Sequence, residues 1–261
     1  MASLEDKVVI ITGSGAGIGQ GIALHLAQFN VKLVLVDIKV DRNNETSQQC
    51  QAIGLSKDKI LTLGCDVRKE EDLQNVVDTT IKTFGSIYGL VNNAGVGINQ
   101  SIENLDMDNY DNTMRVNLRA PVYLSKLCIP YLKQSKGSVV NMSSILSQRG
   151  YPLLPVYSMT KAALNHFTHL FAAEMAEYGV RCNCICPGYT RSEFRANAGI
   201  VEPPDIHATQ SSIIPLKRIG EPEDVGKLVK FLLSEESSYI TGEEIRIDGG
   251  RANPVFQIIS K

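Results

Sequence analysis

The sequence predicts one doubly wound α/β domain, in which helices cover both faces of a parallel sheet. Six to seven short, β-branched apolar runs alternate with segments whose apolar residues recur at helical spacing. A glycine-rich turn directly follows the first run. Because no linker interrupts the 261 residues, we expect a single domain over 1–261. Ligands of such domains bind at the carboxyl ends of the strands, where we expect the site.

The first half of the chain supplies four of these strands. The runs rich in Val, Ile and Leu have the length of buried strands, and the segments between them carry apolar residues three or four positions apart. In order, we expect strand 8–12, helix 20–29, strand 31–36, helix 40–58, strand 60–64, helix 70–84 and strand 87–91.

The second half continues this alternation and completes a Rossmann-type parallel sheet. We expect a long helix over 107–134, either broken or continued near Pro121. Residues 191–215 lack clear periodicity, and a loop of that length in a compact domain is usually functional, so we expect a substrate lid there. The other expected elements are strand 138–142, helix 157–179, strand 180–186, helix 222–234 and strand 243–247.

Composition and charge exclude several classes of partner. The net charge is −2 without a long run of either sign, so nothing indicates a nucleic-acid or membrane-surface partner. No apolar stretch reaches the ~18 residues that span a bilayer, and the N-terminus lacks the basic start and apolar run of a secretory signal. We therefore expect a cytoplasmic protein without disulfides.

Three of the six cysteines stand close together and require comparison with metal sites. Cys182, Cys184 and Cys186 alternate along a predicted strand, which places their side chains on one face. Zinc sites usually hold paired cysteines around a turn. We expect buried strand side chains and no metal, with a metal site as the alternative.

The turn after the first strand has the spacing G-x-x-x-G-x-G, through Gly13, Gly17 and Gly19. Glycine lets the backbone turn sharply and approach a ligand closely. The N-terminus of the following helix offers free N–H groups and a positive dipole end to a phosphate. The strand–turn–helix context therefore favours a dinucleotide site over the alternative of a flexible turn.

Asp37 ends the second predicted strand. A carboxylate there accepts hydrogen bonds from the adenosine ribose hydroxyls and repels a 2′-phosphate. Position 16, just before Gly17, is Ala rather than a basic residue. Both observations indicate NAD(H) rather than NADP(H), whereas an ordinary strand-end turn is the alternative interpretation of Asp37.

Two later strand ends also carry polar residues. Asp66 and Val67 follow the third strand, where they are placed to meet an adenine ring, and a polar turn containing Asn93 follows the fourth. Asn117 lies among apolar residues of a predicted helix. Such an Asn is usually a core residue bonded to backbone, and the alternative is that it holds a water molecule beside the site.

Tyr157 and Lys161 stand four residues apart, so in a helix both side chains emerge on one face. A free tyrosine titrates near pH ~10, and a lysine held close to it favours the phenolate and lowers that pKa. The pair can therefore serve as an acid/base, although a surface Tyr and Lys on an ordinary helix is the alternative.

Together these residues resemble the classical short-chain dehydrogenases/reductases, and the resemblance extends over essentially the whole chain. Ser144 precedes Tyr157 by thirteen residues, which is the usual interval in that family. The resemblance rests on Thr12-Gly13-x-x-x-Gly17-Ile18-Gly19, Asp66, Asn92-Asn93-Ala94-Gly95, Asn117, Ser144, Tyr157-x-x-x-Lys161 and Pro187-Gly188.

The resemblance implies roles for the catalytic residues. Tyr157 would be the general acid/base, and Ser144 would hydrogen-bond the same substrate oxygen. Lys161 would bind the nicotinamide ribose and lower the Tyr157 pKa, while Asn117 would hold a proton-relaying water. It also implies a homotetramer and hydride transfer to or from a nicotinamide cofactor, which Asp37 indicates is NAD. The implied cofactor contacts are Gly13, Gly17, Ile18, Gly19, Asp37, Asp66, Val67, Asn93, Tyr157, Lys161, Pro187 and Thr190.

The substrate pocket is expected to be apolar, which favours a hydrophobic secondary alcohol or ketone of steroid, acyl or terpenoid type over a sugar. Charged residues in 191–212 leave a polar substrate tail as an alternative. Two further functions stay open: an NADPH-dependent carbonyl or 3-oxoacyl reductase, and a non-catalytic cofactor-binding protein. The expected pocket residues are Ser144, Leu146, Tyr151, Leu154, Tyr189 and Phe194.

Overall fold

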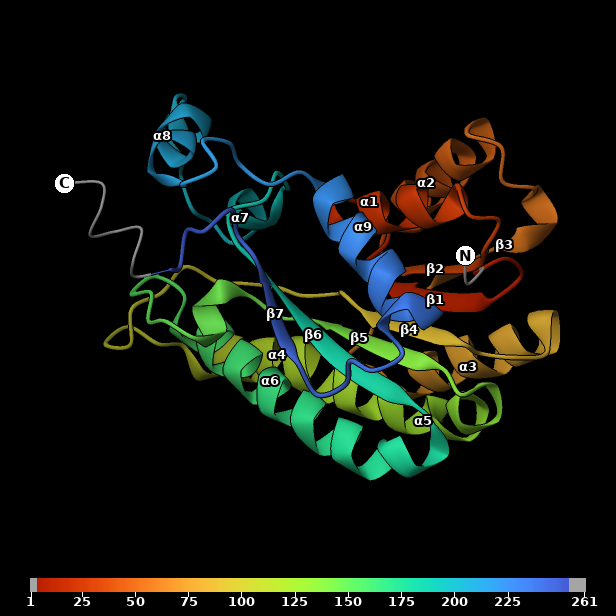
Figure 1. Ribbon diagram of the computed structural model, residues 1–261. Coiled ribbons are helices and arrows are strands. Elements are labelled where there is room, and N and C mark those ends of the chain that lie inside the picture. Colours follow the sequence, from red (N-terminus) through yellow and green to blue (C-terminus); the bar gives the residue numbers. More distant parts are fainter. Residues whose placement is uncertain (1–3, 254–261) are drawn as a thin grey trace.

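The computed structural model describes residues 4–253, so residues 1–3 and 254–261 of the expected domain lie outside the described residues. Seven parallel strands form one sheet in the order β3-β2-β1-β4-β5-β6-β7, which confirms the predicted doubly wound, Rossmann-type fold (Figure 1). The strands are β1 Val8–Thr12, β2 Lys32–Asp37, β3 Ile60–Gly64, β4 Gly89–Asn92, β5 Ser138–Met142, β6 Arg181–Pro187 and β7 Glu244–Ile247.

The strand order reverses between β1 and β4. The chain proceeds outward from β1 to β3 and then crosses back to β4, which pairs with the other side of β1. The connections leaving β1 and β4 therefore diverge, and a crevice opens at the carboxyl ends of these two strands.

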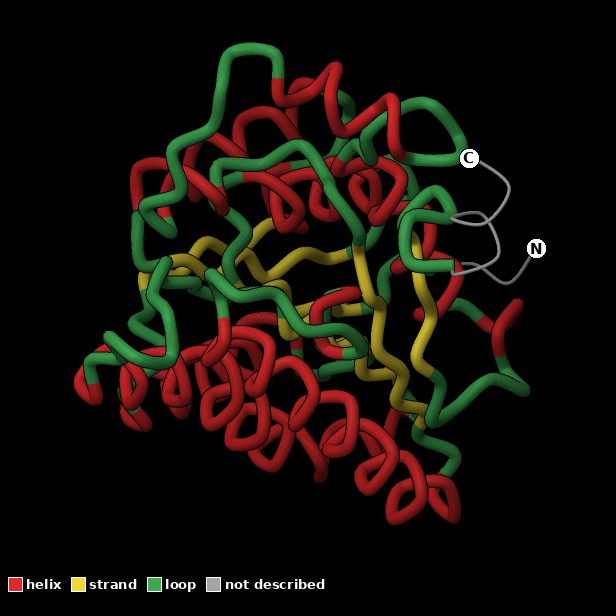
Figure 2. The backbone as a smooth tube through the Cα atoms, turned by 90° about the vertical axis from the view of Figure 1, so that its left-hand side faces the viewer, coloured by secondary structure: helices red, strands yellow, loops and turns green. Residues whose placement is uncertain are grey.

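Helices cover both faces of the sheet, as Figure 2 shows edge-on. One apolar layer lies beneath α1 (Gly17–Ala27), α2 (Val40–Ala52) and α9 (Pro222–Leu233). The other lies beneath α3 (Glu70–Phe84), α5 (Ala120–Ser135) and α6 (Pro155–Met175). Strands β1 and β2 are almost entirely inaccessible because both of their faces are covered, which explains their continuous apolar sequence.

The predicted long helix continues past Pro121 by changing its winding. Helix α4 (Met107–Met114) passes through a π-helical turn at Arg115–Arg119 into α5. Pro121 has no N–H to donate to the carbonyl four residues earlier, that of Asn117, and the π turn accommodates this missing bond. Asn117 therefore lies in the π-helical turn, and its carbonyl receives no hydrogen bond from residue 121.

Several predicted boundaries need correction. Helix α2 ends at Ala52 rather than 58, because a turn through Gly54 and a 3-10 helix at Lys57–Lys59 lead into β3. The segment 191–215, expected to be irregular, contains α7 (Phe194–Asn197) and α8 (Ile206–Ile213). Among the described residues, no helix is long and apolar enough to cross a membrane.

Candidate active site

The glycine-rich turn packs directly against the end of β4. Asn93 donates from Nδ2 to the Thr12 and Gly13 carbonyls at 2.9 and 3.1 Å, and the Thr12 hydroxyl accepts from the Asn93 and Ala94 N–H groups at 3.0 Å. A Cβ on Gly13 would lie 2.9 Å from the Ala94 Cα, and Gly13 has φ +67°. Only glycine permits this approach, so the turn keeps its surface free of side chains.

The first turn of α1 is open to an anion. Ala16 occupies the N-cap position without a side-chain hydrogen bond, and the first turn holds no acidic residue. Gly17, with φ +54°, and Ile18 line the cavity in front of it, whereas Gly19 lies behind, where a Cβ would meet the Gly13 carbonyl oxygen at 2.0 Å. The helix dipole and the uncapped N–H groups fit the pyrophosphate of a dinucleotide.

Asp37 stands at the end of β2 beside this turn. Its two carboxylate oxygens accept from the Gly15 and Lys39 N–H groups at 2.9 and 2.8 Å. The side chain also lines the cavity, and Arg42 of α2 lies next to it. An ionised carboxylate has acceptor positions beyond these two bonds, so the geometry fits ribose hydroxyls.

Asp66 and Val67 line the cavity beyond Asp37, at the end of β3. The Asp66 carboxylate forms an ion pair with Arg68 at 2.6 Å, which lowers its pKa below the usual range. Its own N–H donates to Asp72 at 2.9 Å. Asp66 is therefore held ionised with a partner of its own, while Val67 supplies apolar surface to the wall.

Tyr157, Ser144 and Lys161 converge at the other end of the same cavity. Strand β5 ends just before Ser144, which caps a 3-10 helix at Ile145–Ser147 through its hydroxyl. The Ser144 side chain also hydrogen-bonds Tyr157, and Lys161 Nζ donates to the Met142 carbonyl at 2.7 Å. The segment after β5 and helix α6 thus bring the Ser144 hydroxyl, the Tyr157 phenol and the Lys161 ammonium to the same end of the cavity.

The expected pKa effect at Tyr157 needs correction. Burial raises the Tyr157 pKa to about 12, and the hydrogen bond from Ser144 opposes that rise only in part. Lys161 Nζ lies 5.4 Å from the Tyr157 ring centroid, and burial lowers its own pKa to about 8. Desolvation therefore dominates both pKa values, because it disfavours the charged form of each group.

Asn117 is fully buried and lies behind the cavity wall. Its side chain donates to the Val96 carbonyl at 2.8 Å and to Thr160 Oγ1 at 3.2 Å, and it accepts from the Val96 N–H at 2.8 Å. These bonds are those of a core amide held by backbone and by a neighbouring hydroxyl. A Cβ on Gly95 would lie 3.4 Å from Asn117 Oδ1 and 3.5 Å from Lys161 Nζ, so both polar groups face the same small space.

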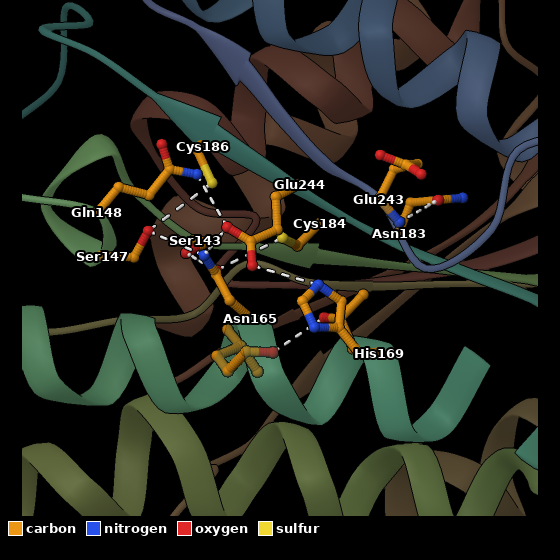
Figure 3. Close-up of polar contacts among 12 residues, drawn as sticks. Ser143, Ser147, Gln148, Asn165, His169, Asn183, Cys184, Cys186, Glu243 and Glu244 are labelled. Atoms are coloured by element: carbon orange, nitrogen blue, oxygen red, sulfur yellow. Dashed lines mark hydrogen bonds and ion pairs between the residues drawn. The ribbon is translucent and has the colours of Figure 1, made fainter. Parts of the chain in front are cut away.

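A polar network supports the catalytic groups from behind (Figure 3). Ser143 donates to the Lys161 carbonyl at 3.2 Å and bonds Asn165 of α6. Asn165 in turn donates to Ser147 at 3.0 Å and to Glu244 of β7. Sequence reasoning missed this network, although a polar Asn165 eight residues after Tyr157, on the buried side of an apolar helix, marked its position.

The cavity has a volume of about 800 Å³ and connects the two ends of the site. All six predicted pocket residues line it, and so do Pro187, the last residue of β6, and Thr190 in the following turn. Phe194 of α7 packs on Tyr157 with ring centroids 4.9 Å apart, next to an apolar cluster around Leu154. The wall near Tyr157 is therefore mainly apolar and aromatic.

Sequence reasoning also missed basic residues of the cavity wall. Arg42, Arg68, Arg149 and Arg251 line it in addition to Arg195. Arg149 lies in the loop after Ser144, and Arg251 lies just beyond β7. Arg149 and Arg251 both follow the carboxyl end of a predicted parallel strand, and this position in the sequence could have identified them as residues of the site.

The cysteines form no disulfide, and all six are buried. Cys182 lies near Asn141, and Cys184 contacts Asn165 on the same face of β6, as the alternation predicts. Among the described residues, no group of three His, Cys, Asp or Glu side chains is arranged to hold a metal ion.

Known proteins are similar to this chain in both sequence and fold. A family model described as "Enoyl-(Acyl carrier protein) reductase" matches residues 13–252. The 3-oxoacyl-[acyl-carrier-protein] reductase FabG of Thermotoga maritima is 34% identical, with 95% of this chain and 98% of the relative covered.

Two solved structures have the same architecture. A short-chain dehydrogenase/reductase of unknown function from Caenorhabditis elegans, solved with cofactor, has a TM-score of 0.90 at 32% identity, covering 95% of this chain and 96% of its own. A 7α-hydroxysteroid dehydrogenase complexed with NADH and 7-oxo glycochenodeoxycholic acid has a TM-score of 0.88 at 28% identity, with 95% of each chain covered. The family model and these relatives span the nucleotide crevice and the Tyr157 cluster alike, and the chain belongs to the short-chain dehydrogenase/reductase family of oxidoreductases.

Proposed function

We propose that this oxidoreductase interconverts a hydrophobic secondary alcohol and its ketone with NAD(H) as the cofactor. The observation that supports this proposal most directly is the shared cavity: Tyr157, Ser144 and Lys161 line the same cavity as the glycine-rich turn and Asp37. A reacting carbon beside Tyr157 would thus share one cavity with a dinucleotide.

The cofactor assignment to NAD rests on charge. The uncapped first turn of α1 fits a pyrophosphate, and the Asp37 carboxylate next to it fits the ribose hydroxyls of NAD. Residues Gly13, Gly17, Ile18, Val67 and Asn93 would complete the adenosine and pyrophosphate contacts. Pro187 and Thr190 would lie beside the nicotinamide, and Gly19 and Asp66 would act indirectly, through turn packing and strand-end structure.

The proton transfer is assigned to Tyr157. When bound, the cofactor supplies hydride acceptance or donation at the substrate carbon. Tyr157 accepts the hydroxyl proton during oxidation and donates it during reduction, and Ser144 holds the same oxygen by a hydrogen bond. Lys161 binds the nicotinamide ribose, and its charge next to a bound substrate opposes the effect of burial on Tyr157. Asn117 holds the water that returns protons toward Lys161.

The substrate assignment rests on the apolar wall. Leu146, Tyr151, Leu154 and Phe194 line the space next to Tyr157, and Tyr189 lines the same cavity. Such a wall favours a steroid, acyl or terpenoid skeleton over a sugar. The segment 191–215 would be the lid over this skeleton.

A second candidate is an NADPH-dependent 3-oxoacyl reductase. Arg42 lines the cavity beside Asp37, where a 2′-phosphate would lie, and the Thermotoga maritima relative is a 3-oxoacyl reductase by name. We rank it second because the Asp37 carboxylate would repel that phosphate and Glu193 already neutralises Arg42.

We also propose a cytoplasmic homotetramer with a small-molecule substrate and no nucleic-acid or membrane partner. Helix α6 exposes Met159 and Leu170, of which Leu170 is 58% accessible, on a face that no other described element covers. These apolar side chains are suited to contact with another subunit.

The test is turnover by Tyr157→Phe, measured by nicotinamide absorbance with NAD or NADP and a panel of steroid, 3-hydroxyacyl thioester, terpenoid and sugar alcohols. We expect kcat to fall about 10²–10⁴-fold while the Kd for NAD stays unchanged. Tyr178→Phe, at the far end of the same helix region, is the matched control and should retain turnover. Full turnover by Tyr157→Phe would refute the assignment.

A further inference from the structure

We propose that the substrate carries an anionic group, which Arg149 and Arg251 bind at the end of the cavity remote from the adenosine site. The proposal deepens the function proposed above, since it concerns the substrate of the same cavity. It commits to an amphiphilic molecule with an apolar body and one acidic end. Carboxylate, sulfonate and phosphate share the chemistry that two guanidinium groups recognise.

Two separate elements bring these arginines to one wall. Arg149 lies in the loop after the 3-10 helix Ile145–Ser147, and Arg251 follows the turn that ends β7. Gln148 donates to the Glu244 carboxylate at 2.8 Å, which fastens the Arg149 loop to β7, as Figure 3 shows. Both side chains line the cavity that contains Tyr157.

Within residues 4–253, Arg149 and Arg251 differ from the other arginines of the cavity wall because they form no ion pair. Five arginines line the cavity, and three of them form ion pairs, namely Arg42 with Glu193, Arg68 with Asp66 and Arg195 with Glu202. Within residues 4–253, no carboxylate lies at ion-pair distance from either Arg149 or Arg251.

The nearest acid does not resolve this imbalance. The Asp248 carboxylate accepts from the Gly250 and Ala252 N–H groups at 2.9 and 2.7 Å, so it stabilises the turn that carries Arg251. Burial and the neighbouring Arg149 charge lower the Arg251 pKa, and the Asp248 charge opposes them only in part. The exposed Arg149 and the half-buried Arg251 thus place two like charges close together on the cavity wall, an arrangement that an anion between them would relieve.

The position of the pair assigns it to the substrate. Arg251 follows β7, the edge strand, whereas Asp37 ends β2 on the other side of β1, β4, β5 and β6. The pyrophosphate position at the start of α1 lies with β1. The Arg149 loop leads instead into Tyr151 and Leu154 of the apolar wall. An acidic group at the pair would therefore continue from an apolar body, not from the dinucleotide.

Binding tests the pair without turnover. Calorimetric titration of the NAD-saturated protein with octanoate, heptanesulfonate, heptyl phosphate and neutral octanamide compares three anionic head groups and one neutral head group on the same seven-carbon alkyl tail. We expect at least one anion to bind at one site per chain about tenfold or more tightly than octanamide. Arg149→Gln combined with Arg251→Gln should abolish that difference and leave octanamide binding unchanged. The preferred head distinguishes the three acids.

Arg246→Gln is the matched control, because Arg246 is an exposed residue of β7 outside the cavity wall. It should leave the preference for the anion intact. Equal binding of all four probes, or an equal loss in Arg246→Gln, would overturn the proposal. Both results are independent of the Tyr157→Phe test, since they need cofactor-bound protein but no reaction.

Discussion

Asp37 is the residue on which the NAD assignment depends, and Asp37→Asn tests it with little change in shape. Each oxygen of the carboxylate accepts one backbone N–H, from Gly15 at 2.9 Å and from Lys39 at 2.8 Å. Asparagine keeps one acceptor and the volume but removes the charge. The glycine-rich turn should therefore retain a support that Asp37→Ala would remove.

Two terms set the expected magnitude. A hydrogen bond to a charged group contributes ~1.5–3 kcal/mol and a neutral one ~0.5–1.5, so each ribose bond should weaken by about 1 kcal/mol. Removing a charge ~5 Å from a 2′-phosphate in water relieves about 1 kcal/mol or slightly more. The sum of about 2–3 kcal/mol corresponds to a change of about 30–150-fold in the preference for NAD over NADP.

The assay is the ratio of the Kd values for NAD and NADP, measured by fluorescence titration in wild type and Asp37→Asn. Adding Glu193→Gln should shift the ratio further toward NADP, because it releases Arg42 from its ion pair. Asp41→Asn is the control, since Asp41 is exposed on α2 and does not line the cavity. A ratio that changes less than about threefold, or equally in the control, would refute the ribose assignment.

Two further predictions concern the catalytic end of the cavity. Phe194→Ala removes the ring packed 4.9 Å from the Tyr157 ring, so KM for an apolar alcohol should rise about tenfold while the Kd for NAD stays unchanged; an unchanged KM would contradict it. Burial lowers the Lys161 pKa from 10.5 in the unfolded chain to about 8 in the folded protein. Between pH 8 and 10.5 the unfolded chain therefore binds one more proton than the folded protein. The free energy of unfolding should rise with pH across that range, by about 3 kcal/mol in total. Urea unfolding from pH 7 to 10 should show that rise in wild type relative to Lys161→Met, and parallel pH dependences would exclude it.

Elements defined by local chemistry could be predicted from the sequence. A run such as Val8–Thr12 is buried on both faces and therefore reads as continuously apolar. Gly13 and Gly17 have positive φ values, which their spacing at a strand–helix junction anticipates. Since parallel strands end at one edge, residues as distant as Asp37 and Tyr157 could be assigned to one site before the structure was known.

What could not be predicted depends on contacts between distant segments or on solvent exclusion. The Tyr157 pKa is raised because the surrounding protein removes water, and a four-residue spacing to Lys161 carries no information about that burial. Asn165 bonds Ser143, Ser147 and Glu244 from three elements, and only the assembled sheet brings these together. The Arg42–Glu193 pair likewise joins residues 151 positions apart.

The start of the segment 191–215 shows what such distant contacts accomplish. Three consecutive residues reach three parts of the site: Ser192 packs on Gly17, Glu193 pairs with Arg42, and Phe194 packs on Tyr157. A backbone movement that withdraws one of them must therefore disturb the phosphate turn, the ribose end and the acid/base together. Cofactor and substrate that both contact this short stretch would each stabilise the same closed arrangement, so their binding should be mutually reinforcing. Sequence periodicity gave no sign of this, because α7 spans a single turn, which is too short to show a helical pattern or to be stable without tertiary contacts.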